Sequence, residues 1–180
     1  MHAFSLTQLF PALARSLPIS YGLSQIVLVL TAAVLFYVAF TDLRSFRIRN
    51  EFVGVLAGLY FVHAFTSGRW VMLPWHLGFA FIIFVVLLFA YARRWLGGGD
   101  VKLLTVAALW TGVGSAFVFC LCLLAFSSAH ALLTKINWLP SYEKDGRPQI
   151  AYAPSIAAAL MAIFMLGYLA PLTYTALGPM

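Results

Sequence analysis

Charged residues are scarce in this sequence. They make up 9% of the 180 residues, whereas hydrophobic residues make up 63%. A composition with so few charged and so many hydrophobic residues excludes a water-soluble domain and indicates a polytopic membrane protein. The net charge of +6 does not predict a nucleic-acid partner, because the basic residues stand in short clusters between apolar runs and not on one amphipathic face.

Cysteine is also scarce. Cys120 and Cys122 lie in one apolar run, point in different directions on a helix, and have no partner cysteines for a disulfide framework or a zinc site. We interpret both as small core residues. His63, His76 and His130 are isolated on apolar segments without metal-ligand spacing, so we interpret them as packed or interfacial. The sequence therefore predicts neither a metal site nor a cofactor.

Long apolar segments are abundant. The first, residues 21–41, has the length of about 20 residues that a helix needs to cross the hydrocarbon core. Further apolar runs cover residues 52–65, 71–91, 101–133 and 151–170. Residues 1–20 lack a basic start and contain two prolines, so we expect an interfacial segment and not a cleavable signal. The predicted fold is all-α, a single integral membrane domain over residues 1–180.

Two further features place these segments in a membrane. The run of residues 101–133 is too long for one crossing and contains Gly112-Val113-Gly114-Ser115, which predicts a tight turn between two helices and thus about six transmembrane helices. Trp70, Trp75, Trp110 and Trp138 lie near predicted span ends, as in an interfacial aromatic belt.

The basic residues predict the orientation. With six crossings, only Arg15 and Arg69 fall on one side. The other side holds Arg44, Arg47, Arg49, Arg93, Arg94, Lys102, Lys135, Lys144 and Arg147. Because cytoplasmic loops carry the excess of Lys and Arg, we expect both termini outside the cytoplasm.

Asp42 and Asp100 then fall on the cytoplasmic side. A carboxylate beside hydrocarbon is costly and is therefore a functional candidate. Only about 12 residues separate Asp100 from the turn at Gly112, or about 18 Å of helix against a core of about 30 Å. We therefore expect Asp100 below the membrane surface, with the glycine-rich backbone before it lining a water-filled cleft.

Two neighbouring carboxyls can hydrolyse a peptide bond. One, ionised, takes a proton from water, while the other, protonated, polarises the scissile carbonyl. Asp42 follows a helix C-terminus and Asp100 opens a helix, so the dipoles of their own helices favour Asp100 as the base and Asp42 as the acid. Arg44 and Lys102 can reverse that order in a coupled pair.

The residues around the two aspartates carry a resemblance. Thr41-Asp42 is followed by Arg47-Ile48-Arg49-Asn50, and Gly97-Gly98-Gly99-Asp100-Val101-Lys102 comes one hairpin later. The pattern resembles the type IV prepilin peptidases, intramembrane aspartyl proteases with a Gly-x-Gly-Asp motif. The resemblance implies that Asp42 and Asp100 are catalytic. The residues it implies as motif support or substrate contacts are Arg47, Asn50, Gly97, Gly99 and Lys102.

This chain departs from the family pattern at Arg49. The family usually has proline there, which leaves the shape of the loop after Asp42 open. The long bacterial members also carry a cytoplasmic domain with paired Cys-x-x-Cys motifs, which this sequence lacks. It is similar to the short members associated with Flp/Tad-type pili, and no methyltransferase activity is expected.

The resemblance also implies a substrate and a location. The substrate is a prepilin or pseudopilin whose short basic leader is cut just before an apolar helix. The enzyme lies in the bacterial inner membrane with its active site facing the cytoplasm. The expected partners are this substrate and the lipid bilayer, and the sequence does not predict an oligomeric state.

Other readings stay open. A presenilin or signal-peptide-peptidase type of enzyme also uses Gly-x-Gly-Asp, but it has tyrosine where Thr41 precedes the first aspartate. A transporter or channel subunit would use the aspartates to bind protons or cations. A third possibility is a noncatalytic assembly factor of a pilus or secretion apparatus, in which the two aspartates have no catalytic role. In the simplest case Asp42 is an interfacial ion-pair partner of the nearby arginines, and the glycine run is a flexible loop.

Overall fold

The computed structural model describes residues 18–46, 48–136, 142–144, 147–149 and 151–176. Its elements are α2 (Pro18–Ser45), α3 (Asn50–Thr66), the 3-10 helix η1 (Trp70–Met72), α4 (Leu73–Ala92), α5 (Gly98–Lys135), β1 (Tyr142–Lys144), β2 (Arg147–Gln149) and α6 (Ala153–Ala176). The antiparallel β1–β2 hairpin is the exception to an otherwise helical fold in this part of the chain. The segment predicted over residues 1–20 lies outside the described residues, except that α2 already includes residues 18–20.

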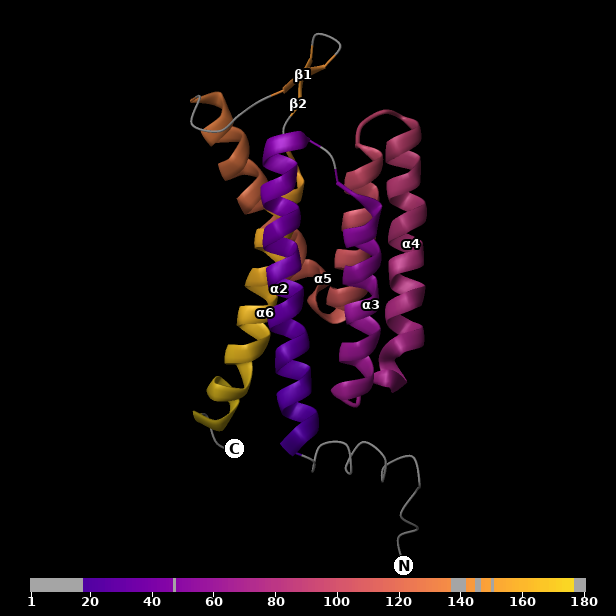
Figure 1. The fold of residues 1–180 in the computed structure, drawn as a ribbon, viewed down its shortest axis with the longest axis vertical. Helices are drawn as coiled ribbons and strands as arrows, with labels where there is room; N and C mark the ends of the chain where they lie inside the picture. The colour runs from indigo at the N-terminus through magenta and orange to yellow at the C-terminus, as the bar shows by residue number, and fades with distance from the viewer. Residues whose placement is uncertain (1–17, 47, 137–141, 145–146, 150, 177–180) are drawn as a thin grey trace, which may run out of the picture.

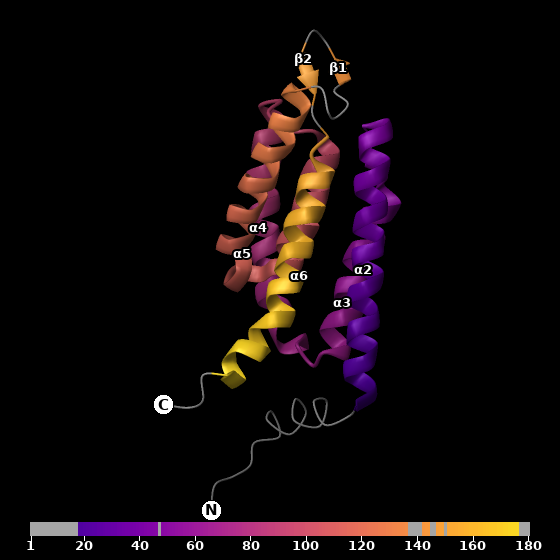
Figure 2. The ribbon, with the colours of Figure 1, turned by 90° about the vertical axis from the view of Figure 1, so that its left-hand side faces the viewer.

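The helices stand side by side (Figure 1). α2 contacts α3 and α6, while α5 contacts α3, α4 and α6. The start of α2 and the end of α6 lie at one end of the bundle, and the β1–β2 hairpin lies at the other (Figures 1 and 2). The end of α2 and the start of α5 therefore share the hairpin end, which brings two segments far apart in the sequence to the same side.

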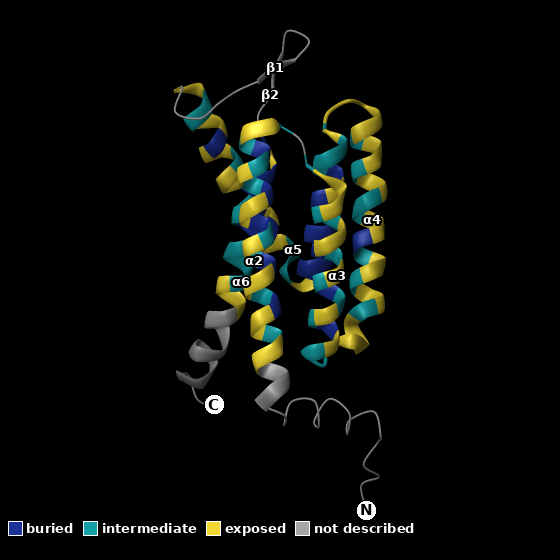
Figure 3. Cartoon of the chain, in the orientation of Figure 1, coloured by how far each residue is buried: buried dark blue, intermediate teal, exposed yellow. Residues whose placement is uncertain are grey.

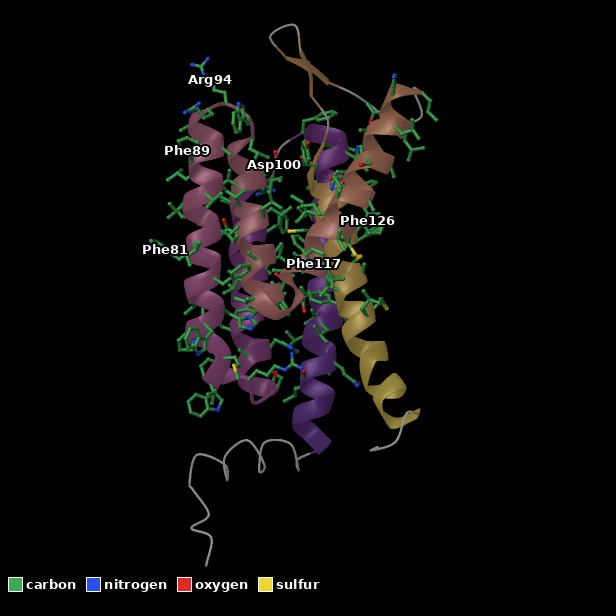
Figure 4. All side chains as sticks on the ribbon, turned by 180° about the vertical axis from the view of Figure 1, so that it is seen from behind. Phe81, Phe89, Arg94, Asp100, Phe117 and Phe126 are labelled. Carbon is green, nitrogen blue, oxygen red and sulfur yellow. The ribbon has the colours of Figure 1, made fainter. Side chains whose placement is uncertain are left out.

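α5 changes direction at Gly112. The φ of 57° and ψ of −174° at this residue are not helical, and they interrupt the helix. Residues 98–111, here called the short arm, run away from the hairpin end beside α4, and residues 113–135, the long arm, return toward it (Figures 1 and 4). Phe117 accordingly lies at mid-height and Phe126 nearer the hairpin end (Figure 4). The predicted break near Gly112 is confirmed. It consists of the single residue Gly112 and not of a four-residue turn, and it lies inside the bundle.

Apolar side chains cover the outside of the bundle. Phe81 and Phe89 of α4 are 66% and 58% exposed and point away from the other helices (Figures 3 and 4). Among the described residues, three helical segments are long and apolar enough to cross a membrane, namely Gly22–Ser45 of α2, Trp70–Ala92 of η1 and α4, and Gly98–Lys135 of α5. An apolar surface of this extent is expected where helices face lipid, where each helix satisfies its own backbone polar groups. The chain is thus a helical membrane protein.

Two sequence-based interpretations need correction. Trp110 is not part of an interfacial belt, because it is buried and its Nε1–H donates to the Leu56 carbonyl oxygen at 3.0 Å. Cys120 is exposed and Cys122 half-buried, so the interpretation of Cys120 as a core residue was wrong. Trp138 lies outside the described residues.

Candidate functional site

Asp42 lies in the last turn of α2 and is 4% exposed. Its Oδ2 accepts a hydrogen bond from the backbone N–H of Ala153 at 3.1 Å. Ala153 is the first residue of α6, where the backbone N–H groups have no partner within the helix. The Asp42 carboxylate therefore binds the positive end of the α6 dipole, although the two residues are 111 positions apart.

The segment after Asp42 turns sharply. Phe46 has a φ of 50°, and its N–H donates to the Asp42 carbonyl oxygen at 2.8 Å. This is a helix C-terminal motif in which the left-handed position is usually glycine, so a phenylalanine there stores backbone strain. Arg47 lies outside the described residues, and its expected supporting role stays a prediction. α3 begins directly after this segment, at Asn50.

Arg49, which stands where the resembling family has proline, keeps a backbone that proline would also adopt. Its φ of −75° lies within the range that the proline ring imposes, about −65 ± 15°. Its side chain makes an ion pair with Glu51 at 2.7 Å, but both side chains are mostly exposed, so this pair adds little stability. By its φ, the backbone at residue 49 is the one that proline would also set.

Asp100 lies in the first turn of α5 and is half-buried. Figure 4 shows it near the start of the short arm, at the same end of the bundle as Arg94. Gly97 and Gly99 leave room that a side chain would fill. A Cβ at Gly97 would come within 2.9 Å of the Asp100 Oδ2, and a Cβ at Gly99 within 3.1 Å of the Ile48 Cβ. The first glycine thus makes space for the carboxylate, and the second lets α5 approach the segment after Asp42.

The two motif segments are also joined by a hydrogen bond. Lys102 Nζ donates to Asn50 Oδ1 at 2.9 Å, across 52 positions of sequence. Together with the contact of Gly99 with Ile48, this bond fixes the start of the short arm against the start of α3. Lys102 has a partner here, so it does not merely extend to the membrane surface.

Asp42 and Asp100 lie on the two segments that these contacts join, Asp42 at the end of α2 and Asp100 at the start of α5. The structure therefore brings together, at one end of the bundle, the segments that carry Asp42, Asp100, Gly97, Gly99, Lys102 and Asn50. Acid–base hydrolysis needs two carboxyls near enough to share a proton, and these segments carry one each. The expected order of acid and base stays a prediction, because the α6 N-terminus opposes the effect of Asp42's own helix.

Sequence reasoning did not predict the contacts of three neighbours of this site. They are Ala153, which binds Asp42; Ile48, which packs on Gly99; and Tyr91, whose ring would contact a Cβ at Gly98 at 3.4 Å. The proline at residue 154, directly after Ala153, was a signal of a helix start but did not indicate which side chain would meet it. Among the described residues, no group of three or more His, Cys, Asp or Glu side chains is placed to hold a metal ion.

Comparison with known proteins agrees with this geometry. The model of the type IV leader peptidase family matches residues 29–135, more than half of the chain, and this range includes both aspartates and the residues that join their segments. No curated protein and no solved structure gives a match. The chain therefore belongs to the type IV leader peptidase family, whose members are aspartic-type peptidases.

Proposed function

We propose that this protein is a membrane-embedded aspartyl endopeptidase that removes the basic leader from prepilins or pseudopilins, with Asp42 and Asp100 as the catalytic pair. The observation that carries the proposal is that the segments bearing the two aspartates meet. Lys102 binds Asn50, and Gly99 packs on Ile48. The family match supports the leader-peptidase role in general.

The proposed reaction follows from two carboxyls that hold one proton between them. The ionised carboxyl accepts a proton from a water molecule, whose oxygen attacks the scissile carbonyl carbon. The protonated carboxyl donates a hydrogen bond to the carbonyl oxygen and stabilises the negative charge that develops there. The C–N bond then breaks, the amine leaves with a proton from a carboxyl, and the new acid terminus remains on the leader.

The location of the charges supports a cytoplasmic site in the bacterial inner membrane. Arg44, Arg93, Lys102 and Lys135 belong to helix ends at the hairpin end of the bundle, whereas Arg69 follows the opposite end of α3 (Figure 1). An excess of basic residues favours the cytoplasmic side. We propose six crossings with both termini outside the cytoplasm, the two arms of α5 counting as separate segments. A leader in the cytoplasm would then reach the aspartates at the start of the substrate's apolar helix.

Carboxyl-to-amide substitutions test the proposal. Asp42→Asn and Asp100→Asn should each lower the rate of leader removal from a co-expressed prepilin by at least about 100-fold, the size of a general acid–base contribution. Glu51→Gln is the matched control, because Glu51 is an exposed carboxylate next to Asn50 in the sequence and forms an exposed ion pair with Arg49. Processing is measured by the mobility shift of the prepilin, and folding by the amount of monodisperse protein extracted from the membrane.

The result that would overturn the proposal is equally definite. If either aspartate variant processes prepilin at the rate of the Glu51→Gln variant, the two carboxyls are not the catalytic pair. Pilus assembly that persists without processing in both variants would instead indicate a noncatalytic assembly factor.

A further inference from the structure

At the Gly112 end of the short arm, opposite to Asp100, lies a set of polar contacts that the proposed reaction does not use. Gly112 interrupts α5 there, inside the apolar bundle. An interrupted helix leaves its last carbonyl groups without their regular N–H partners. In a bilayer no water replaces those partners, so protein groups must satisfy the carbonyls.

Two side chains do so. His76 Nδ1 lies 2.9 Å from the Leu109 carbonyl oxygen, and because a carbonyl can only accept, His76 is the donor. Thr111 Oγ1 donates to the Ala108 carbonyl oxygen at 3.3 Å. His76 belongs to α4, 33 positions from Leu109, so the hydrogen bond ties the end of the short arm to a different helix.

The fit between His76 and the break is close. A Cβ at Gly112 would lie 2.6 Å from the His76 Cε1 and Nε2, so only glycine leaves room for this ring. Tyr60 of α3 stacks against the His76 ring, with ring centroids 5.8 Å apart and an interplanar angle of 23°. Tyr60 in turn meets Trp110, whose indole N–H binds Leu56 of α3. The end of the short arm is thus held by α4 and α3 together.

We propose that His76 is a positioning residue for the Asp100 carboxyl. The short arm is a helix of 14 residues, roughly 21 Å long. The Gly99 and Lys102 contacts hold it at the Asp100 end, and the His76 hydrogen bond holds it at the Gly112 end. A helix held at both ends keeps its position along its axis and its rotation about that axis. If the Gly112 end is released, the short arm can shift along its axis and carry Asp100 away from Asp42.

The role in catalysis rests on the proposed function. A misplacement of about 1 Å in a catalytic group can lower a rate by about 100-fold. Release of the short arm should therefore lower kcat. It should change the KM for prepilin less than kcat, because His76 lies at the opposite end of the short arm from Asp100.

Three variants separate positioning from general destabilisation. His76→Leu removes the donor, and His76→Asn restores an N–H at the position of Nδ1. His130→Leu is the control, since His130 is also buried and its Nε2 has no hydrogen-bond partner among the residues that the structure describes. We expect His76→Leu to lower kcat about 10- to 100-fold. His76→Asn should recover most of that loss, and His130→Leu should match the wild type.

A second measurement does not depend on activity. Glu51→Cys of α3 and Thr105→Cys of the short arm, introduced together after replacement of Cys120 and Cys122 by alanine, leave the Lys102–Asn50 bond in place and report the position of the short arm through cross-linking by bis-maleimides of graded length. His76→Leu should lower the yield with the shortest reagent that links the pair and raise it with longer ones. His76→Asn and His130→Leu should keep the pattern of the parent pair.

The outcomes distinguish the two proposals. If no prepilin is cleaved by the wild type, the proposed function fails, and the cross-linking pattern alone decides whether His76 holds the short arm. If His76→Leu keeps both kcat and the cross-linking pattern, or changes both no more than His130→Leu does, His76 is not a positioning residue. An equal loss in His76→Asn and His76→Leu would also overturn the proposal, because the donor would then be irrelevant.

Discussion

The two arms of α5 are both apolar, yet the protein uses them in different ways. In the short arm every residue from Val106 to Thr111 is buried, as are Val101 and Leu103. In the long arm only Phe119 and His130 are buried among residues 113–135, and Phe117 is 74% exposed. The short arm carries Asp100 and lies among other helices, whereas the long arm presents apolar side chains to the outside (Figure 4).

The difference shows what decides burial inside a membrane. Lipid tails are as apolar as leucine, so an apolar side chain gains little from facing protein instead of lipid. Small residues and polar groups that find partners hold helices together. In the short arm Ala107 and Ala108 are buried and the Trp110 N–H binds Leu56, whereas small residues of the long arm such as Gly114, Ser115 and Ala116 stay exposed or half-buried. Small residues alone therefore do not bury a helix, and contacts with neighbouring helices decide the difference.

The largest loss of stability should come from substitution of Gly112, the glycine that separates the two arms. Gly112→Ala places a Cβ at a φ of 57° and within 2.6 Å of the His76 ring. The left-handed backbone and the overlap together should lower the free energy of unfolding by roughly 3 kcal/mol. Unfolding by SDS in mixed micelles, followed by tryptophan fluorescence, measures the change.

Gly114, two residues into the long arm, is the matched control. A Cβ there meets nothing within 4 Å, and alanine is the better helix former by about 1 kcal/mol. Gly114→Ala should therefore leave the unfolding free energy unchanged or raise it slightly. If Gly112→Ala and Gly114→Ala lowered the free energy of unfolding equally, tight packing would not be confined to the short arm and the break, and the comparison of the two arms would fail.

A smaller effect should follow from loss of one hydrogen bond in the short arm. Trp110→Phe keeps an aromatic ring but removes the Nε1–H that binds the Leu56 carbonyl oxygen. The lost bond should lower the free energy of unfolding by about 1–2 kcal/mol. Phe117→Leu changes an aromatic residue of the long arm that is 74% exposed, and it should change stability by less than about 0.5 kcal/mol. The same micelle titration compares the two, and a larger loss for Phe117→Leu would reverse the comparison.

Much of the fold could be predicted from the sequence. Apolar runs of crossing length predicted the helices, and the glycines near residue 112 predicted the reversal in α5. The place of Trp110 could not be predicted, because a tryptophan near a span end suits an interface as well as a core, and its partner is a backbone carbonyl on another helix. For the same reason nothing in the sequence showed that His76 would meet the Leu109 carbonyl.

The candidate site was predictable in part. The motifs around Asp42 and Asp100 indicated which residues belong to it, and the structure brings together those that it describes. The surroundings of Asp42 were not predictable from its own helix, since the N-terminus of α6 reaches it from 111 positions away. Local pattern thus identified the reactive groups, whereas long-range packing determines the environment of each one.

The smallest effects, here on the rate of prepilin processing, should come from two lysines at the end of the bundle where the β1–β2 hairpin lies. Lys102 belongs to the short arm and Lys135 to the long arm. Lys102→Met removes the donor to Asn50 Oδ1, and because this bond is exposed it should cost no more than about 1 kcal/mol, or about fivefold in the rate of prepilin processing. Lys135→Met removes an exposed charge from the end of the long arm and should leave that rate unchanged within about twofold. If Asn50→Ala combined with Lys102→Met is no worse than either change alone, the hydrogen bond accounts for the loss. Additive losses would mean that each residue acts separately, and the bond would then not be what holds the start of the short arm in place.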